Sequence, residues 1–140
     1  MLVSTKGRYA LRIMIDLAQH SNGEYVVLMD IARRQNISEK YLEGIVASLS
    51  RLGLLQAQRG RGGGYRLARA PEEYPVGEII RSSEGHVAPV SCLKTEKIDC
   101  PQADECITLP MWRELDRRID RFLDSVTLAD LIHGTIPVEP

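Results

Sequence analysis

The stretch LLQAQRGRGGGYRLA, Leu54 to Ala68, decides the fold. Two short runs with strand character, Leu54–Gln58 and Tyr65–Ala68, flank a glycine-rich turn at Gly60–Gly64, and this pattern predicts a β-hairpin. Glycines let such a turn reach positive φ and approach another backbone closely.

The predicted hairpin is strongly basic. No acidic residue occurs from Arg51 to Ala70, whereas four arginines lie at or behind the tip: Arg59, Arg61, Arg66 and Arg69. Arginine at a hairpin tip suits insertion into the narrow, electronegative minor groove of DNA. A solvated hairpin without a partner would not require this sign of charge.

Apolar residues at helical spacing predict three helices before the hairpin. The first covers residues 5–20 and the second about 28–35, each after residues that can start a helix. Three residues of the second helix are expected to face inward: Met29, Ile31 and Ala32. Ser38 caps the third helix, and Gly53 stands where a helix-terminating glycine belongs. Two helices joined by a short turn are typical of a helix-turn-helix, and a hairpin directly after them is typical of a wing.

The second half of the chain predicts a different arrangement. VGEIIRSSEG (76–85) predicts a short helix, and a long helix is expected over about 108–126. The apolar stripe of the long helix consists of Trp112, Leu115, Ile119, Phe122, Leu123 and Val126. A long, one-sided helix so far from the DNA-binding half is a candidate dimer interface, and packing within the chain is the alternative. TLADLIHG (127–134) predicts a short closing helix.

These elements predict a mainly α fold with a small β-hairpin, namely a winged helix-turn-helix domain followed by a long C-terminal dimerisation helix. At 140 residues the chain can bury a core without disulfides. We expect four segments: a DNA-binding domain at 1–70, a connecting helix and cysteine-bearing loop at 71–107, the dimerisation and closing helices at 108–133, and a loose tail at 134–140.

Charge is divided unevenly between the two halves. Residues 1–70 hold 11 Lys and Arg and 5 Asp and Glu, a net of +6, and residues 71–140 hold 7 and 14, a net of −7. A basic half beside an acidic half indicates that the first half meets a polyanion. No apolar run approaches the roughly 18 residues that cross a bilayer, and no signal-peptide pattern begins the chain, so a cytoplasmic protein without a membrane partner is expected. Neither a phosphate loop nor a nucleophile–base pair occurs, which argues against an enzyme.

All three cysteines lie close together, as Cys92, Cys100 and Cys106. Three is an odd number for a disulfide framework and one short of a tetrahedral metal site. In a reducing compartment, clustered cysteines bind metal more often than they bridge, and thiolates are the usual ligands of iron–sulfur clusters. Zinc with one further ligand, and three free thiols that bind nothing, are the alternatives.

Several motifs, in their order, resemble the IscR/NsrR/CymR family of bacterial winged-helix transcriptional regulators. They are STKGRYALRIMIDLA, ISEKYLEGIVASL, GLLQAQRGRGGGYRLA, VGEIIR, the three cysteines, Trp112 and TLADL. The resemblance covers about 1–133 and is closest to the IscR branch, which regulates iron–sulfur cluster assembly. It implies a homodimer on a near-palindromic operator in double-stranded DNA, with a 2Fe–2S cluster deciding whether and where it binds. The cysteine loop is then expected to abut the DNA-binding half, so that ligation shifts the recognition helix or the wing.

The resemblance also implies which residues contact DNA. Five lie near the start of the recognition helix: Ser38, Lys40, Tyr41, Glu43 and Gly44. Arg59 matches a minor-groove arginine of the wing. Three further residues match phosphate contacts: Lys6, Arg8 and Arg61. The acid at Glu43 discriminates between operators, because a carboxylate accepts from cytosine but repels phosphate. Gly44 replaces the glutamine of the IscR branch, so the operator is expected to differ.

The fourth cluster ligand is the point at which this chain departs from its resemblance. The IscR branch has a histidine three residues after the last cysteine, and other members use an acid in the first helix of the partner subunit. Those positions hold Leu109 and Arg8 here, and neither can ligate iron. The ligand therefore stays open among His86, Asp99, Asp104 and Glu105, with Glu96 and Thr108 as further candidates. His86 is the only imidazole near the loop, and it equally fits an ordinary solvent-exposed residue.

Two other functions fit parts of the sequence. STKGRY, IMIDLA and EEYPVGEIIRSSEGHVAPV also resemble the CymR branch, which represses cysteine-metabolism genes through a partner protein and does not need three cysteines. A small redox or electron-transfer protein is a third reading, which the wing and the basic half disfavour.

Overall fold

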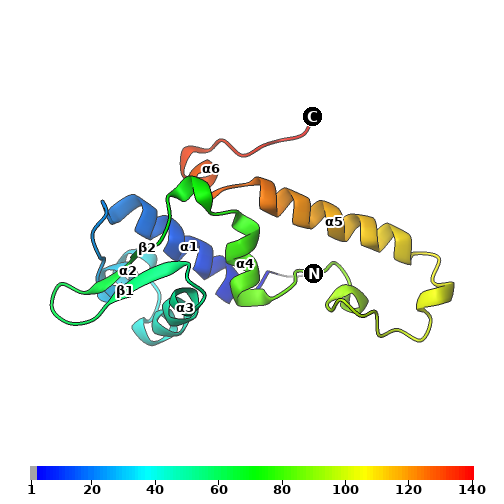
Figure 1. Cartoon of the computed structure of the whole chain (residues 1–140), viewed down its shortest axis with the longest axis horizontal. Helices are drawn as coiled ribbons and strands as arrows, with labels where there is room; N and C mark the ends of the chain where they lie inside the picture. Colours follow the sequence, from blue (N-terminus) through cyan, green and yellow to red (C-terminus); the bar gives the residue numbers. More distant parts are fainter. Residues whose placement is uncertain (1–2) are drawn as a thin grey trace.

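Six α-helices and one two-stranded antiparallel hairpin make up residues 3–140, the part of the chain that this computed structural model describes (Figure 1). The helices are α1 (Thr5–His20), α2 (Leu28–Gln35), α3 (Glu39–Arg51), α4 (Val76–Glu84), α5 (Leu109–Ser125) and α6 (Leu128–His133), and the strands are β1 (Leu55–Gln58) and β2 (Gly64–Leu67). The prediction of a mainly α fold with a small hairpin is confirmed. Within the described range no helix is both long enough and apolar enough to cross a membrane.

Local capping signals set the limits of the first three helices. The Ser4 hydroxyl accepts from the backbone N–H of Gly7 at 3.5 Å, and the Ser38 hydroxyl accepts from that of Tyr41 at 3.2 Å. α2 ends at Asn36, whose left-handed φ of 53° closes the helix. The bounds predicted for α1 and α2 are confirmed. They could be predicted because the signals that end a helix lie close to its ends in the sequence.

The main core lies between α1, α2, α3 and the base of the hairpin. Its fully buried side chains include Ile13, Leu17, Ile31, Ile45 and Leu49. The inward face predicted for α2 is wrong at Met29, which is 53 % exposed. The core-facing stripe of α2 runs from Leu28 to Ile31 and Ala32, one helical turn apart, and Met29 lies to the side of that stripe.

A third backbone segment fixes the hairpin to the core. β1 and β2 pair with Gln58 opposite Gly64. Val26, in the connection between α1 and α2, forms a further antiparallel bridge with Tyr65 through N–H···O bonds of 2.8 and 2.9 Å. A Cβ at Gly64 would stand 2.1 Å from the Val26 carbonyl oxygen. The glycine-rich run therefore permits a close backbone approach as well as a turn.

Tyr74 joins the wing to the rest of the fold. Its side chain is fully buried, and its hydroxyl donates to the carbonyl of Leu54 at 2.7 Å. The same hydroxyl accepts from the backbone N–H groups of Ala68 and Arg69 at 2.9 and 3.0 Å. The Tyr74 carbonyl accepts from the N–H of Leu128 at 2.9 Å, at the start of α6. One residue thus holds both outer ends of the hairpin and the closing helix.

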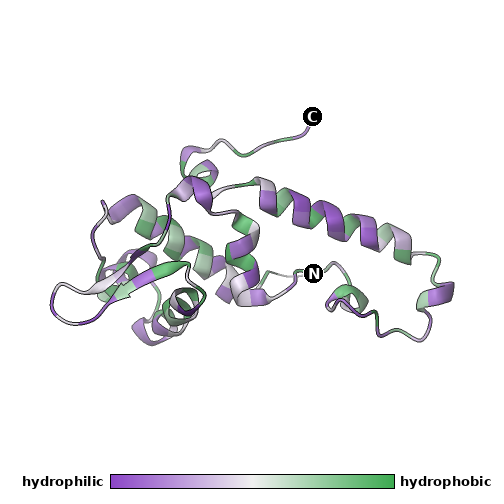
Figure 2. Ribbon diagram, viewed as in Figure 1, coloured by the Kyte–Doolittle hydropathy of each residue, from purple (hydrophilic) through white to green (hydrophobic). Residues whose placement is uncertain are grey.

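α5 extends away from the core as a long, separate helix (Figure 1). Arg81 of α4 holds it through a contact with Asp120 at 3.4 Å and an ion pair with Asp124. Figure 2 shows polar and apolar residues alternating along α5, as its predicted stripe requires. Large apolar side chains on this helix stay exposed: Met111, Leu115 and Phe122, by 54, 40 and 50 %.

Asp16 of α1 is a buried carboxylate that its position in an apolar stripe did not predict. It is fully buried and accepts from the Arg34 guanidinium at 2.7 and 3.0 Å and from Gln35 Nε2 at 2.8 Å. Burial by itself raises the pKa of Asp16, but the hydrogen bonds from Arg34 and Gln35 and the charge of Arg34 outweigh it, so the pKa lies below its ordinary value of 3.8. Asp16 therefore ties α1 to the last turn of α2.

Replacing Asp16 with asparagine should lower the free energy of unfolding by about 2–3 kcal/mol, because the partly buried Arg34 loses its anionic partner. The folded-state pKa is lowered, so the contribution of the carboxylate is fully present above pH 3.8 and is lost as the pH falls through the folded-state pKa. Denaturant unfolding at neutral and acidic pH should show a steeper acid loss for the wild type than for Asp16→Asn.

The matched control is Asp30→Asn, which removes the exposed pair that Asp30 forms with Arg33 at 3.9 Å. This change should cost less than about 0.5 kcal/mol. Equal costs for the two variants would show that Asp16 has no special place in the fold.

Candidate DNA interface and cysteine loop

The first turns of α3 present the residues predicted to enter the major groove. All five are exposed: Ser38, Lys40, Tyr41, Glu43 and Gly44. The opposite face of α3 is buried, through Leu42, Ile45, Val46 and Leu49. Because α3 is amphipathic, burial of its apolar stripe turns the polar residues outward. Their contacts with DNA stay a prediction.

α1 supports the N-terminal end of α3. The rings of Tyr9 and Tyr41 meet edge to face, with centroids 5.7 Å apart. The Arg12 guanidinium lies 5.0 Å from the Tyr9 ring centroid and donates to the carbonyl oxygen of Gln35 at 2.6 Å. The orientation of Tyr41 on the recognition helix therefore depends on the position of α1.

The four hairpin arginines divide into two pairs. Arg66 lies over the Tyr25 ring at 4.3 Å and donates to the Gly23 carbonyl at 3.0 Å, and Arg69 pairs with Glu78 at 2.9 Å. These two arginines therefore fix the base of the wing. Arg59 and Arg61 are exposed at the tip, where Gly60 and Gly62 have φ of 90° and 75°. The tip pair is open to solvent, and its contacts with DNA stay a prediction.

The remaining predicted phosphate contacts, Lys6 and Arg8, are exposed in the first turns of α1. Arg8 Nη2 donates to Thr5 Oγ1 at 3.3 Å, and the first turn of α1 holds no acidic residue. Both side chains can therefore reach a phosphate from the surface.

The segment 85–108, between α4 and α5, carries the three cysteines and lies at the opposite end of the chain from the wing (Figure 1). The start of this segment does pack on the DNA-binding half, where Val87 joins an apolar cluster with Val3 and Leu11, whereas the part that carries the cysteines lies away from the wing. An apolar cluster pins the loop to the start of α5 instead, and its members include Ala88, Leu93, Leu109 and Trp112.

The three thiols are reduced, and each is half-buried. Cys92 and Cys106 pack against the apolar cluster, and Cys100 begins a turn in which its carbonyl accepts from Ala103. The loop thus brings two of the cysteines to one apolar wall, with the third on the adjoining turn.

Cys106 stands at the N-terminus of α5. Its sulfur lies 3.5 Å from Thr108 Oγ1. This hydroxyl, together with the backbone N–H groups of Thr108 and Leu109, lowers the pKa of the Cys106 thiol below its ordinary value despite some desolvation. A helix N-terminus and a hydroxyl donor favour the thiolate, which is the form that binds metal.

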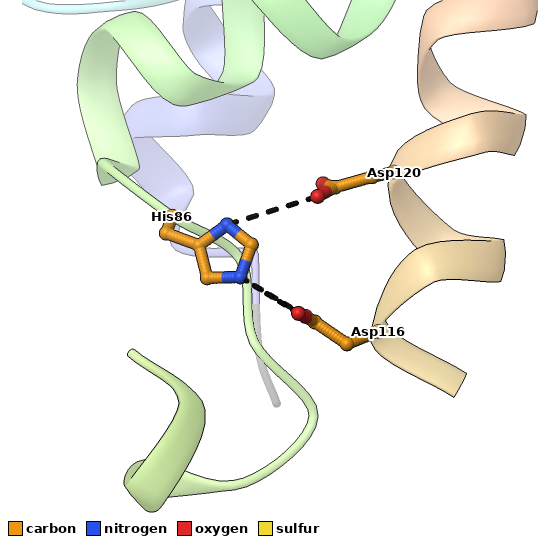
Figure 3. Close-up of side chains that lie close together, drawn as sticks. All are labelled: His86, Asp116 and Asp120. Carbon is orange, nitrogen blue, oxygen red and sulfur yellow. Dashed lines mark hydrogen bonds and ion pairs between the residues drawn. The ribbon is translucent and has the colours of Figure 1, made fainter. Parts of the chain in front are cut away.

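His86, a candidate fourth ligand, faces α5 rather than the thiols. Its Nε2 lies 3.0 Å from Asp116 Oδ1, and its Nδ1 lies 4.0 Å from Asp120 Oδ2 (Figure 3). To ligate iron at the cysteines, His86 would have to leave these carboxylates. This pairing was not predicted, although Asp116 and Asp120 are spaced by one helical turn and so share a face of α5.

The acidic candidates stand on the surface of the loop. Asp99, Asp104 and Glu105 are exposed, as is Glu96. Thr108 is beside Cys106, as described above. The structure therefore leaves several oxygen donors around the thiols, and the identity of the fourth ligand stays a prediction.

A helix-turn-helix with an exposed basic wing directly after it defines a winged-helix DNA-binding protein. The family model of Rrf2, described as an iron-dependent transcriptional regulator, matches residues 3–134. The chain belongs to the Rrf2 family and is an IscR-like transcriptional regulator rather than an enzyme.

The similarity to known proteins extends over nearly the whole chain. The HTH-type transcriptional regulator IscR of Serratia proteamaculans (strain 568) is 41% identical over 134 residues, which are 96% of this chain and 80% of that protein. The structure of T. potens IscR superposes with a TM-score of 0.75 at 41% identity, covering 96% of this chain and 88% of that one. CymR, the global cysteine regulator of B. subtilis, gives a TM-score of 0.75 at 38% identity, covering 94% and 95%. The resemblance expected from the motifs is confirmed.

Arg59→Ala should weaken binding to a DNA duplex that the wild-type protein has selected from a random pool, by about 1–3 kcal/mol. Wild-type affinity should also fall steeply with salt, because Lys and Arg contacts release counterions. Fluorescence anisotropy over a salt series measures both effects. The control is Arg117→Ala on α5, which should leave the affinity unchanged, and equal effects of the two variants would refute the wing assignment.

Proposed function

We propose that the chain is a homodimeric regulator that senses iron–sulfur status through a 2Fe–2S cluster and controls genes of cluster assembly at a near-palindromic operator. Cys92, Cys100 and Cys106 would hold the cluster, and residues 1–70 would bind DNA. The observation that carries the proposal is the set of three reduced thiols on one loop of an IscR-like chain.

The chemistry of the loop fits such a cluster. Thiolates are its usual ligands, and the environment of Cys106 favours the thiolate. The apolar wall around Cys92 and Cys106 limits access of water to the sulfur atoms. A bound cluster would supply sensitivity to iron supply and oxidants, and the residues of the chain would position it.

A dimer is supported by α5. Met111, Leu115 and Phe122 expose 40–54% of their surface on a helix whose other side packs on the chain. Exposed apolar side chains at helical spacing on a long helix favour association with a second copy. Arg117 and Arg118 both pair with Glu114 within the helix, so the charged side of α5 is satisfied without a partner.

The alternative is a CymR-like repressor of cysteine metabolism that works through a partner protein without a cluster. The similarity to B. subtilis CymR over 94% of this chain favours it. The three cysteines have no assigned task in that function, which is why we place it second.

Anaerobic reconstitution with iron and sulfide should give a coloured protein with about two irons and two sulfides per chain. Replacing any of the three cysteines with serine should abolish the visible absorption. Alanine at His86, Asp99, Asp104 or Glu105, one at a time, should identify the fourth ligand, with His133→Ala as the matched control. A colourless, iron-free protein that still binds DNA would favour the CymR-like function.

Phe122→Asp should convert the dimer to a monomer, because a charge replaces a large apolar side chain in the proposed interface. Sedimentation velocity measures the mass directly. Leu52→Asp is the control, since Leu52 is 56% exposed at the end of α3, away from α5. A wild-type monomer, or a Phe122→Asp dimer, would overturn this interface.

A further inference from the structure

Glu84, the last residue of α4, caps the first helix of the DNA-binding half. One oxygen of its carboxylate accepts from the backbone N–H of Ser4 at 2.8 Å and from that of Gly7 at 3.1 Å, and it also bonds the Ser4 hydroxyl. The approach is so close that a Cβ at Gly7 would stand 2.5 Å from this oxygen. Glu84 and Ser4 are 80 residues apart, so tertiary structure alone creates this cap.

His86, two residues further on, makes the corresponding connection to α5. Its ring bridges the carboxylates of Asp116 and Asp120 (Figure 3). Gly85 between them has φ 70° and ψ −145°, a conformation that essentially only glycine adopts. This glycine lets two neighbouring side chains point to two different helices.

The segment Glu84–His86 is also where the cysteine loop begins. Val87, the next residue, is buried in a cluster with Val76, Ile80 and Val126, against which Val3 and Leu11 pack. Cys92 follows five residues after Val87. A movement of the loop or of α5 therefore reaches this segment before it reaches the DNA-binding half along the chain.

The N-terminal end of α1, on the other side of Glu84, carries the candidate DNA contacts. Lys6 and Arg8 are predicted to bind phosphate, and Tyr9 meets Tyr41 of the recognition helix at a centroid distance of 5.7 Å. A shift of this end of α1 would move two phosphate contacts and the packing partner of a base-reading residue together.

We propose that Glu84–His86 is the joint that couples the cysteine loop and α5 to the DNA-binding surface, and that Glu84 is a positioning residue for the start of α1; this inference rests on the proposed function. His86 attaches this segment to α5, and Glu84 attaches it to the start of α1. A displacement of the segment would therefore displace the start of α1. The remaining link, from Tyr9 to Tyr41, reaches the recognition helix. Coupling of this kind requires one element that contacts both the cysteine loop with α5 and the DNA-binding surface, so that a change at either site shifts its position.

The first test compares operator affinity of the iron-loaded and iron-free full chain, on a duplex selected by the wild-type protein. The wild-type affinities should differ on the order of tenfold. Glu84→Ala should keep the visible absorption of the loaded protein but bring the two affinities to within about twofold of each other. Glu84→Gln retains an acceptor for Ser4 and Gly7 and should restore most of the difference.

Glu72→Ala is the matched control, because Glu72 is exposed on the short turn before α4. It should leave the ratio of affinities as in the wild type. A Glu84→Ala protein that keeps the wild-type ratio would overturn the proposal, whereas a change in melting temperature alone would assign Glu84 a purely structural role.

The second test does not require a cluster. In the iron-free full chain, His86→Asn should raise amide hydrogen exchange at Ser4 and Gly7 on the order of fivefold, the effect of weakening about one hydrogen bond. His133→Asn, the same change on α6, should not. If the chain binds no iron but His86→Asn loosens Ser4 and Gly7, the proposed sensing fails and the joint stands. If exchange at these amides is unchanged, the joint fails.

Discussion

The buried hydroxyl of Tyr74 is the interaction on which the wing depends. It satisfies the carbonyl of Leu54 before β1 and the amides of Ala68 and Arg69 after β2, three backbone groups that would otherwise be buried without partners. A two-stranded hairpin is marginally stable on its own, so its orientation must come from what holds its ends. The carbonyl of the same residue also accepts a hydrogen bond from the first backbone N–H of α6. The position of the hairpin and the placement of α6 therefore depend on the same residue.

Elements whose signals are local could be predicted from sequence, and connections between distant polar groups could not. The helices, the hairpin and the caps at Ser4 and Ser38 depend on periodicity, turn residues and spacing within a few positions. The pairings of Asp16 with Arg34 and of Glu84 with Ser4 join residues 18 and 80 positions apart. The residues around each of them in the sequence do not indicate the partner, because each side chain by itself resembles an ordinary surface group. The prediction that Met29 faces the core was wrong for a different reason. Met29 lies beside the buried stripe of α2, and an apolar residue next to such a stripe need not be buried.

The candidate site divides in the same way. The exposed residues of α3 and the tip arginines follow from amphipathicity and from hairpin geometry, and the motifs placed them correctly on the surface. The sequence could not distinguish arginines that hold the wing in place from arginines that are available to contact DNA. Arg66 and Arg69 are held by Tyr25 and Glu78, so part of the basic charge of the hairpin serves to build the wing. Charge counts alone therefore overstate the number of groups available to phosphate.

Leu109 occupies the position at which the resemblance to the IscR branch implied a histidine ligand. It is 7% exposed, and it joins Ala88 and Leu93 in the apolar cluster that fixes the loop to α5. A ligating side chain at this first helical position would sacrifice that packing, so here the position serves the wall behind the thiols rather than the iron. The candidate donors on the loop, Asp99, Asp104 and Glu105, are exposed carboxylates. An oxygen ligand holds iron less firmly than sulfur or imidazole does, so one iron of such a site would be the first to be lost or attacked. A readily lost iron suits a regulator, because its response follows iron supply.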